Sequence, residues 1–163
     1  MALHKALLAE FTYEAQSTRK VLERVPQDQF SWQPHDKSMS LFHLAKHVAD
    51  LAEWTTMTVT LNELDLSQKF PVKEISSTAE LLAHFDEKVE TAKKVLAETN
   101  DEVLEQIWTL KMGDHVIMSM PKKAVIRSVC FNHTYHHRGQ LTVYLRLLGV
   151  ALPNIYGPTA DEQ

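Results

Sequence analysis

The sequence predicts an all-α fold in which four long helices pack as a bundle. Only four glycines and six prolines occur in 163 residues, so long uninterrupted helices are easier to build than a turn-rich β architecture. Apolar residues recur at helical spacing over four segments of about 20 to 28 residues. Because no repeat, low-complexity stretch or linker divides the chain, we expect residues 1–163 to form a single domain.

The first three helices are predicted by apolar periodicity over about 2–24, 40–62 and 78–98. Pro26 stops the first apolar pattern. Ser38 or Ser40 can cap the second helix, because its hydroxyl can accept a hydrogen bond from a free N–H of the first turn. Ser77 and Glu80 fit a capping box at the start of the third helix.

The rest of the chain contains the fourth helix. Residues 101–105 can form a short helical turn, and β-prone residues on either side of the Gly113–Asp114 pair suggest a small hairpin between the third and fourth helices. Pro121 suits the first position of a helix, where its missing N–H is not needed. The fourth helix is predicted over about 121–148, and it stops at Gly149, a residue suited to a left-handed C-cap.

Composition excludes several classes of protein. The net charge is −4 with histidines neutral, and the basic residues are scattered, whereas a nucleic-acid binder needs a basic face to neutralise phosphates. No apolar stretch approaches the roughly 20 residues that span a bilayer. The N-terminal segment lacks the apolar region and cleavage site of a signal peptide, and the single cysteine, Cys130, fits a reducing compartment. We therefore expect a cytoplasmic protein that binds neither nucleic acid nor membranes.

Histidine is over-represented, with nine copies in the chain. Positions i and i+4 of a helix lie on one face. In the predicted fourth helix, His133 and His137 interrupt an apolar stripe that includes Cys130 and Leu141, so we expect both imidazoles to point into the bundle. Burying two imidazoles together is costly unless their nitrogens have partners. A divalent transition metal is such a partner, because neutral imidazole binds these ions well.

The second predicted helix supplies a third histidine, because its apolar stripe contains His47 between Leu44 and Leu51. If the second helix packs against the fourth, His47 can reach the other pair. Three nitrogen ligands with an open position are typical of a catalytic metal site. Taken alone, a pair of histidines at i, i+4 more often has hydrogen-bond partners or faces solvent than binds a metal. With His47 on a second apolar stripe, we weigh a metal site and this simpler interpretation equally. The motifs of zinc proteases, zinc fingers and di-iron bundles are absent from the sequence.

The other candidates have simpler interpretations. His43 could be a fourth ligand or could support one, although a core histidine is the favoured interpretation. His136 points about 100° away from His137, which favours a supporting or surface role. Cys130 is interpreted as a small buried hydrophobe rather than a nucleophile. The histidines without an apolar stripe or partner are expected in solvent: His4, His35, His84 and His115.

Two segments resemble the DinB-like proteins. The segment HTYHHRGQL at 133–141, followed by LPNIYGP at 152–158, resembles the corresponding block of that family, and SLFHLAKH, which ends at His47, is similar to its first ligand helix. The resemblance covers nearly the whole chain. It implies an up-down-down-up four-helix bundle with a long crossover loop, often dimeric, and a divalent metal held by His47, His133 and His137.

The resemblance also indicates the cofactor and the chemistry. We expect one divalent transition metal, zinc or nickel first and iron or manganese as further candidates, because nitrogen-rich sites accept several ions. The wider superfamily includes metal-dependent transferases that use low-molecular-weight thiols such as bacillithiol, and a mycothiol-dependent maleylpyruvate isomerase. We therefore expect small-molecule partners and a homodimer.

Three functions remain open from the sequence. The first is a transferase that joins a low-molecular-weight thiol to a small electrophile, with the metal lowering the pKa of the thiol or of a water. Arg138 could pair with an anionic cosubstrate, although a solvated Arg138 is the default, and Gln140 could orient a ligand or merely pack. The second is a stress-induced metal-binding or interaction protein without catalysis. The third is a metal-dependent hydrolase, for which no carboxylate stands out as a general base.

Overall fold

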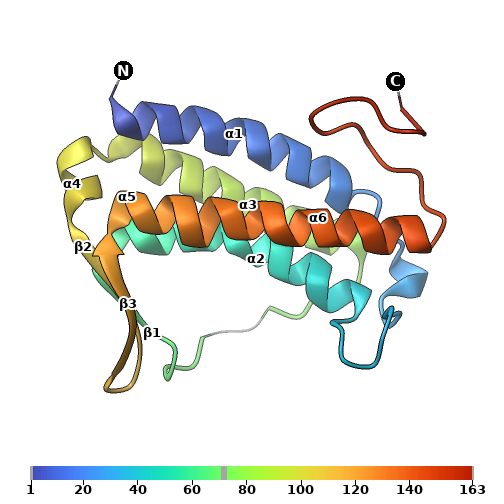
Figure 1. The fold of residues 1–163 in the computed structure, drawn as a ribbon, viewed down its shortest axis with the longest axis horizontal. Helices are drawn as coiled ribbons and strands as arrows, with labels where there is room; N and C mark the ends of the chain where they lie inside the picture. The colour runs from blue at the N-terminus through green and yellow to red at the C-terminus, as the bar shows by residue number, and fades with distance from the viewer. Residues whose placement is uncertain (1, 71–72, 163) are drawn as a thin grey trace.

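In a computed structural model that describes residues 2–70 and 73–162, long helices pack side by side and a small sheet covers one end of them (Figure 1). The main helices are α1 (Leu3–Leu22), α2 (Leu41–Thr60), α3 (Thr78–Glu98) and a last helical rod formed by α5 (Lys122–Val125), η2 (Ile126–Phe131) and α6 (Asn132–Leu147). The shorter elements are η1 (Gln27–Gln29), α4 (Asp101–Glu105), β1 (Glu63–Asp65), β2 (Ile107–Met112) and β3 (His115–Pro121).

The prediction of an all-α four-helix bundle is wrong, because the fold is mixed α/β and contains a three-stranded sheet in the order β1-β2-β3. The hairpin suggested by the sequence is present as the antiparallel pair β2–β3, with Gly113 in the turn at a φ of 59°. β1 then adds in parallel to β2, with Leu64 opposite Leu110. A strand of three residues is too short to carry a recognisable period-two pattern, so its pairing is decided by tertiary contacts.

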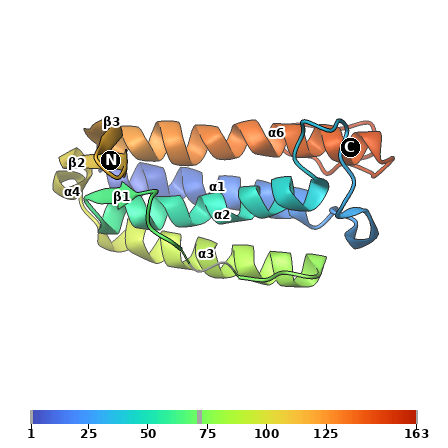
Figure 2. The ribbon, with the colours of Figure 1, turned by 90° about the horizontal axis from the view of Figure 1, so that it is seen from below.

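The sheet has its own small core at the end of the helices. Buried Leu64, Trp108, Leu110 and Val125 pack together there. The larger core lies between the long helices, and α2 runs between α3 and the last helical rod (Figure 2). Among the described helices, none combines the length and the apolar character needed to span a bilayer.

Capping residues set the helix ends, which lie within two residues of the predicted ones. The side chain of Ser40 accepts a hydrogen bond from the N–H of His43, and that of Ser77 accepts one from the N–H of Glu80. Gly149 ends the last rod with a φ of 74°, a left-handed conformation that glycine adopts without a steric cost.

The last rod is not a uniform α-helix, because η2 is a six-residue π-helical segment. A π turn holds an extra residue, and one residue corresponds to about 100° of α-helical rotation. Lys122 and Val125 are buried before this segment, and Phe131, Arg138 and Leu145 are buried from its end onward. On an uninterrupted α-helix these two sets would face different directions, so the π segment allows both to face the core.

Candidate metal centre

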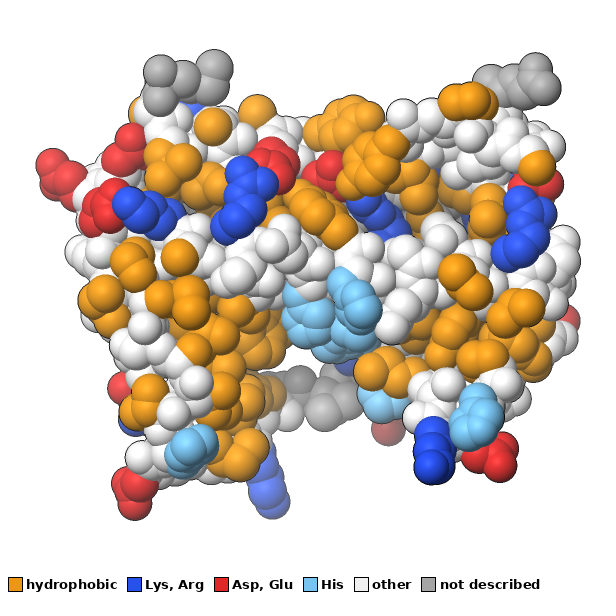
Figure 3. Space-filling model, in the orientation of Figure 1, with side chains coloured by type: hydrophobic (Ala, Val, Ile, Leu, Met, Phe, Trp, Pro, Cys, Tyr) orange, Lys and Arg blue, Asp and Glu red, His pale blue; other side chains and the backbone are white. Residues whose placement is uncertain are grey.

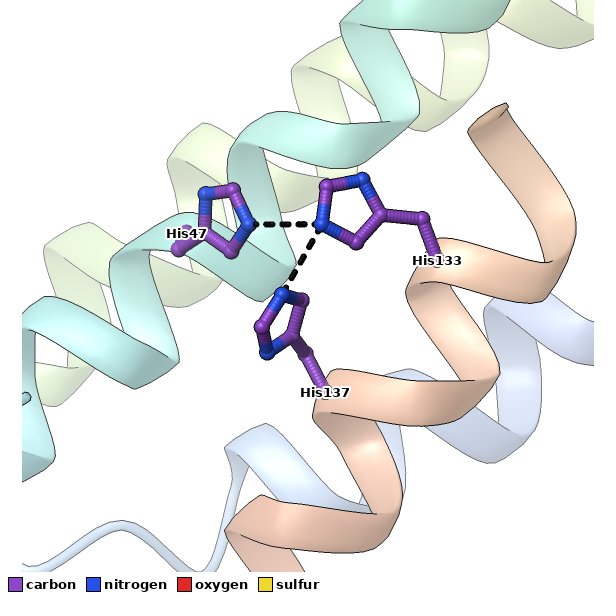
Figure 4. A group of neighbouring side chains, drawn as sticks. All are labelled: His47, His133 and His137. Atoms are coloured by element: carbon purple, nitrogen blue, oxygen red, sulfur yellow. Dashed lines mark hydrogen bonds between the residues drawn. The ribbon is translucent and has the colours of Figure 1, made fainter. Parts of the chain in front are cut away.

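The three predicted histidines meet at the seam between α2 and α6 (Figure 4). His47 projects from α2, and His133 and His137 project from successive turns of α6. Nε2 of His133 lies 3.3 Å from Nε2 of His47 and 2.8 Å from Nε2 of His137. One nitrogen from each ring lies within 4.8 Å of the other two. Helix packing therefore joins side chains that are 86 residues apart in the chain.

The π segment explains why the cluster is accessible. A uniform helix would direct His133 and His137 into the middle of the core, as the sequence predicted. The rotation in η2 instead gives those core positions to Phe131 and Arg138 and leaves the two histidines half-buried at the edge. Figure 3 shows histidine side chains near the centre of this face, above a hollow in the surface. A small molecule can reach such a site without opening the core.

The donor set fits a metal ion better than a set of imidazole–imidazole hydrogen bonds. Each imidazole nitrogen carries either one proton or one lone pair, so Nε2 of His133 can form a full hydrogen bond with only one of its two neighbours. Nδ1 of His137 donates to Oε1 of Gln140 at 2.7 Å, which leaves a lone pair on Nε2 of His137. In a tetrahedral zinc site the ligand nitrogens are about 3.3 Å apart. The observed 3.3 Å contact matches this spacing, and the 2.8 Å contact is somewhat shorter.

Electrostatics keep the cluster ready to bind a cation. Burial, followed by the nearby His137 and His133, lowers the pKa of His47 from 6.5 to about 4. Burial, followed by His137, also lowers the pKa of His133. Both rings are therefore neutral at neutral pH, and a neutral imidazole is the form that binds metals.

Gln140 and Arg138 have different surroundings. Gln140 holds the ring of His137 in one orientation through the hydrogen bond to Nδ1. Arg138 is buried, so the default interpretation of a solvated side chain is wrong. Its guanidinium lies 2.7 Å from a carboxylate oxygen of Glu14 and donates to Oγ1 of Thr18 at 3.1 Å. The rings of Tyr135 and Tyr156 lie 5.4 and 5.3 Å from its charge. Arg138 thus joins α6 to α1.

The remaining sequence candidates lie outside the cluster. His43 is exposed, so its interpretation as a core histidine is wrong, and His136 is also exposed. Cys130 is buried as expected, and burial raises the pKa of its thiol to about 12. A thiol with that pKa is not ionised at neutral pH and is a poor nucleophile.

Sequence reasoning missed His84, which it placed in solvent. Only 4% of this residue is exposed, and its Nε2 lies 2.7 Å from a carboxylate oxygen of Asp50. The signal was present in the sequence, because His84 falls on the apolar stripe of α3 next to Leu81 and Phe85. Asp50 in turn pairs with Lys46 at 2.7 Å on α2.

A model of the DinB family matches residues 1–163. The chain belongs to the DinB family. The uncharacterized protein YrdA of Bacillus subtilis is 23% identical over 165 residues, which cover 95% of this chain and 89% of YrdA. The uncharacterized protein YjoA of the same organism is 24% identical, over 91% of this chain and 93% of YjoA.

Solved structures of DinB-like proteins share the fold of this DinB-family chain. The crystal structure of YjoA from Bacillus subtilis superimposes with a TM-score of 0.72 at 19% identity, covering 97% of this chain and 99% of that one. A DinB-like protein from Bacillus cereus gives a TM-score of 0.72 at 23% identity, covering 93% and 97%. At these identities the likeness establishes the fold, and the reaction must be argued from the site.

Proposed function

We propose that this DinB-family protein holds one divalent transition metal through His47, His133 and His137 and uses it to transfer a low-molecular-weight thiol to a small electrophile. The observation that carries the proposal is the convergence of three imidazole nitrogens within 4.8 Å at an accessible seam. Imidazole binds a metal in its neutral form, so a three-histidine ligand set does not reduce the charge of a divalent ion. Such an ion lowers the pKa of a bound thiol or water.

The chain's own residues favour an external nucleophile. The thiol of Cys130 is buried and its raised pKa keeps it protonated. The carboxylate of Asp50, three residues after His47, is occupied by Lys46 and His84. A hydrolase would need a free general base near the ligands, and Asp50 is a poor candidate for that role. A thiol cosubstrate supplies its own nucleophile and needs only to be bound and deprotonated.

The first test is elemental analysis of untagged protein after reconstitution with zinc, nickel, iron or manganese. We expect about one equivalent of metal in the wild type and none in the His133→Ala/His137→Ala variant. The matched control is His43→Ala/His136→Ala, which removes two exposed histidines from the same helices and should keep the metal. Wild-type protein that stays metal-free would refute the site.

The second test measures the reaction. The metal-loaded protein is incubated with a chromogenic aryl halide, with and without cysteine or bacillithiol, and the thioether is quantified. We expect turnover that requires both thiol and metal and is lost in the His133→Ala/His137→Ala variant. Substrate consumption without thiol would indicate that the protein is a hydrolase rather than a transferase. Full metal loading without turnover of any thiol would indicate a metal-binding protein instead.

A further inference from the structure

A cavity separate from the histidine cluster lies against α2 and α3, on the side that faces β1 and the segment after it. Its volume is about 540 Å³, enough for a small organic molecule. None of the three clustered histidines lines it, although Lys46 and Trp54, which do, lie on the same helix as His47. The cavity therefore forms a site of its own beside the candidate metal centre.

The cavity wall carries equal numbers of positive and negative groups arranged as ion pairs. Lys46 pairs with Asp50 at 2.7 Å, Lys88 with Glu53 at 2.5 Å, and Lys73 with Glu87 at 3.4 Å. The charges of the three lysines and the three carboxylates in these pairs sum to zero. A ligand with a single charge would leave one wall group unbalanced, whereas a ligand with both signs can pair with a lysine and a carboxylate at once.

His84 fixes part of this wall and leaves a polar atom unused. Its Nε2 holds Asp50 at 2.7 Å. Its Nδ1 is buried and finds no hydrogen-bond partner among the described residues. Because this nitrogen is sealed from solvent, a ligand in the cavity does not reach it, and His84 contributes to the wall by holding Asp50 in place.

The other part of the cavity is apolar. Trp54 and Met57 from α2 line it together with Leu64 and Leu66 from β1 and the residue after it. These side chains also border the small core of the sheet, so the apolar wall is anchored. It can accept an aromatic or aliphatic body next to the charged wall.

From this geometry we infer that the cavity binds a zwitterionic small molecule with an apolar body, of the class of the free α-amino acids with large apolar side chains. The ammonium and carboxylate groups lie against the Lys88–Glu53 and Lys46–Asp50 pairs, and the side chain lies against Trp54 and Met57. The inference does not depend on the metal or on thiol transfer.

Isothermal titration calorimetry with three probes tests this ligand class. L-Phenylalanine carries both charges, 3-phenylpropanoate only the negative one, and 2-phenylethylamine only the positive one. We expect saturable binding of L-phenylalanine and at least tenfold weaker binding of the other two. Absence of L-phenylalanine binding up to its solubility, or equal affinity for all three probes, overturns the inference.

Variants locate the binding. Lys88→Met/Glu53→Gln removes one wall pair without changing the net charge and should weaken L-phenylalanine binding at least tenfold. Lys46→Met removes the positive member of the second pair while Asp50 keeps His84 as a partner, and it should weaken binding too, even if the first variant does not fold. The matched control, Lys93→Met/Glu90→Gln, removes a pair with a 2.7 Å contact elsewhere on α3 and should bind normally. Equal losses in the control contradict the assignment.

An amino acid can also chelate a metal ion, so the titration is repeated on the His133→Ala/His137→Ala variant. Retained binding supports the cavity as the site. Lost binding in this variant, with the fold intact by circular dichroism, means that the probe binds the metal centre, and the inference fails.

Discussion

Gln140 is the residue whose side chain supports a ligand of the candidate centre. Its Oε1 accepts a hydrogen bond from Nδ1 of His137, which directs Nε2 of that ring toward His133. Partners of this kind typically contribute a factor of about 10 to 100 in metal affinity. We expect Gln140→Ala to weaken zinc binding by roughly that factor, and Gln140→Glu, which keeps an acceptor oxygen, to bind nearly as well as wild type.

Competition of the protein with a chromogenic chelator measures these affinities. Asn132→Ala is the control, because Asn132 is an exposed residue of the same helix and its loss should leave zinc affinity unchanged. If Gln140→Ala binds zinc as tightly as the control does, the hydrogen bond to His137 has no role in holding the ligand.

Arg138 presents the opposite case, a conspicuous motif residue with a structural role. Its side chain is 3% exposed and that of its partner Glu14 is 13% exposed. Removing one member of a buried ion pair leaves an uncompensated charge and costs about 3 to 5 kcal/mol. We expect Arg138→Met to lower the free energy of unfolding in urea by about that amount, while the folded fraction still binds one metal ion.

Arg127→Met is the matched control for Arg138→Met. Arg127 pairs with Glu10 in the same helix contact, but its side chain is 53% exposed. Exposed pairs contribute roughly 0 to 1 kcal/mol, so this variant should unfold much like wild type. An Arg138→Met protein that is fully stable but has lost metal would show that Arg138 serves the centre after all.

Single residues could be predicted from the sequence where local spacing decides their position. His133 and His137 lie four residues apart, and an i, i+4 pair shares a helix face whatever surrounds it. His47 falls on the seam because of its place on the α2 stripe. Arg138 could not be placed in this way, because its burial depends on Glu14 from another helix and on the rotation introduced by η2.

At the scale of elements, the π segment decides which face of α6 meets α2. Its six residues, Ile126–Phe131, hold one residue more than the same turns of an α-helix would. That extra residue is invisible to a periodicity argument, which assumes 3.6 residues per turn throughout. The predicted stripe therefore located the helix correctly in the chain. For the second half of the helix, however, it assigned to the core a face that lies about 100° away from the buried one.

Length changes in η2 test this role. Deleting Ser128, an exposed residue inside the segment, should convert the π turn to α-helix and leave both flanks facing as before, so metal binding should persist. Inserting one alanine between Phe131 and Asn132 should rotate the following histidines by about 100° and abolish metal binding. Elemental analysis and far-UV circular dichroism distinguish these results. Equal metal loss in both variants would show that the π geometry itself is required.

The sheet is the element that local sequence could not reveal in full. The hairpin was predictable, because the Gly113–Asp114 turn and its β-prone flanks are contiguous in the chain. β1 consists of three residues, and its parallel partner β2 begins only after α3 and α4. The alignment of Glu63 with Thr109 is a consequence of how α2 and the last rod pack, and no sequence window contains both strands.

At the scale of the whole molecule, the candidate centre joins the first half of the chain to the last. α2 and α6 also pack against each other, and Leu44 of α2 and Leu141 of α6 belong to the same buried core. A metal ion held by His47 from one helix and by His133 and His137 from the other would add a cross-link at the accessible edge of that contact. The unfolded chain cannot hold the three nitrogens together, so an ion that binds the folded state stabilises it.

Thermal unfolding with and without zinc measures this linkage. At a free zinc concentration 100 times the Kd, binding to the folded state adds about 2.7 kcal/mol of stability, which corresponds to a rise in Tm of roughly 5 to 10 °C for a domain of this size. We expect that rise in wild type and in His43→Ala/His136→Ala, and its absence after chelation or in His133→Ala/His137→Ala. As the pH falls toward the pKa of about 4 of His47, protons compete for the same nitrogens and the rise should shrink. A rise that is independent of pH, or that persists without the two α6 histidines, would place the bound zinc elsewhere on the surface.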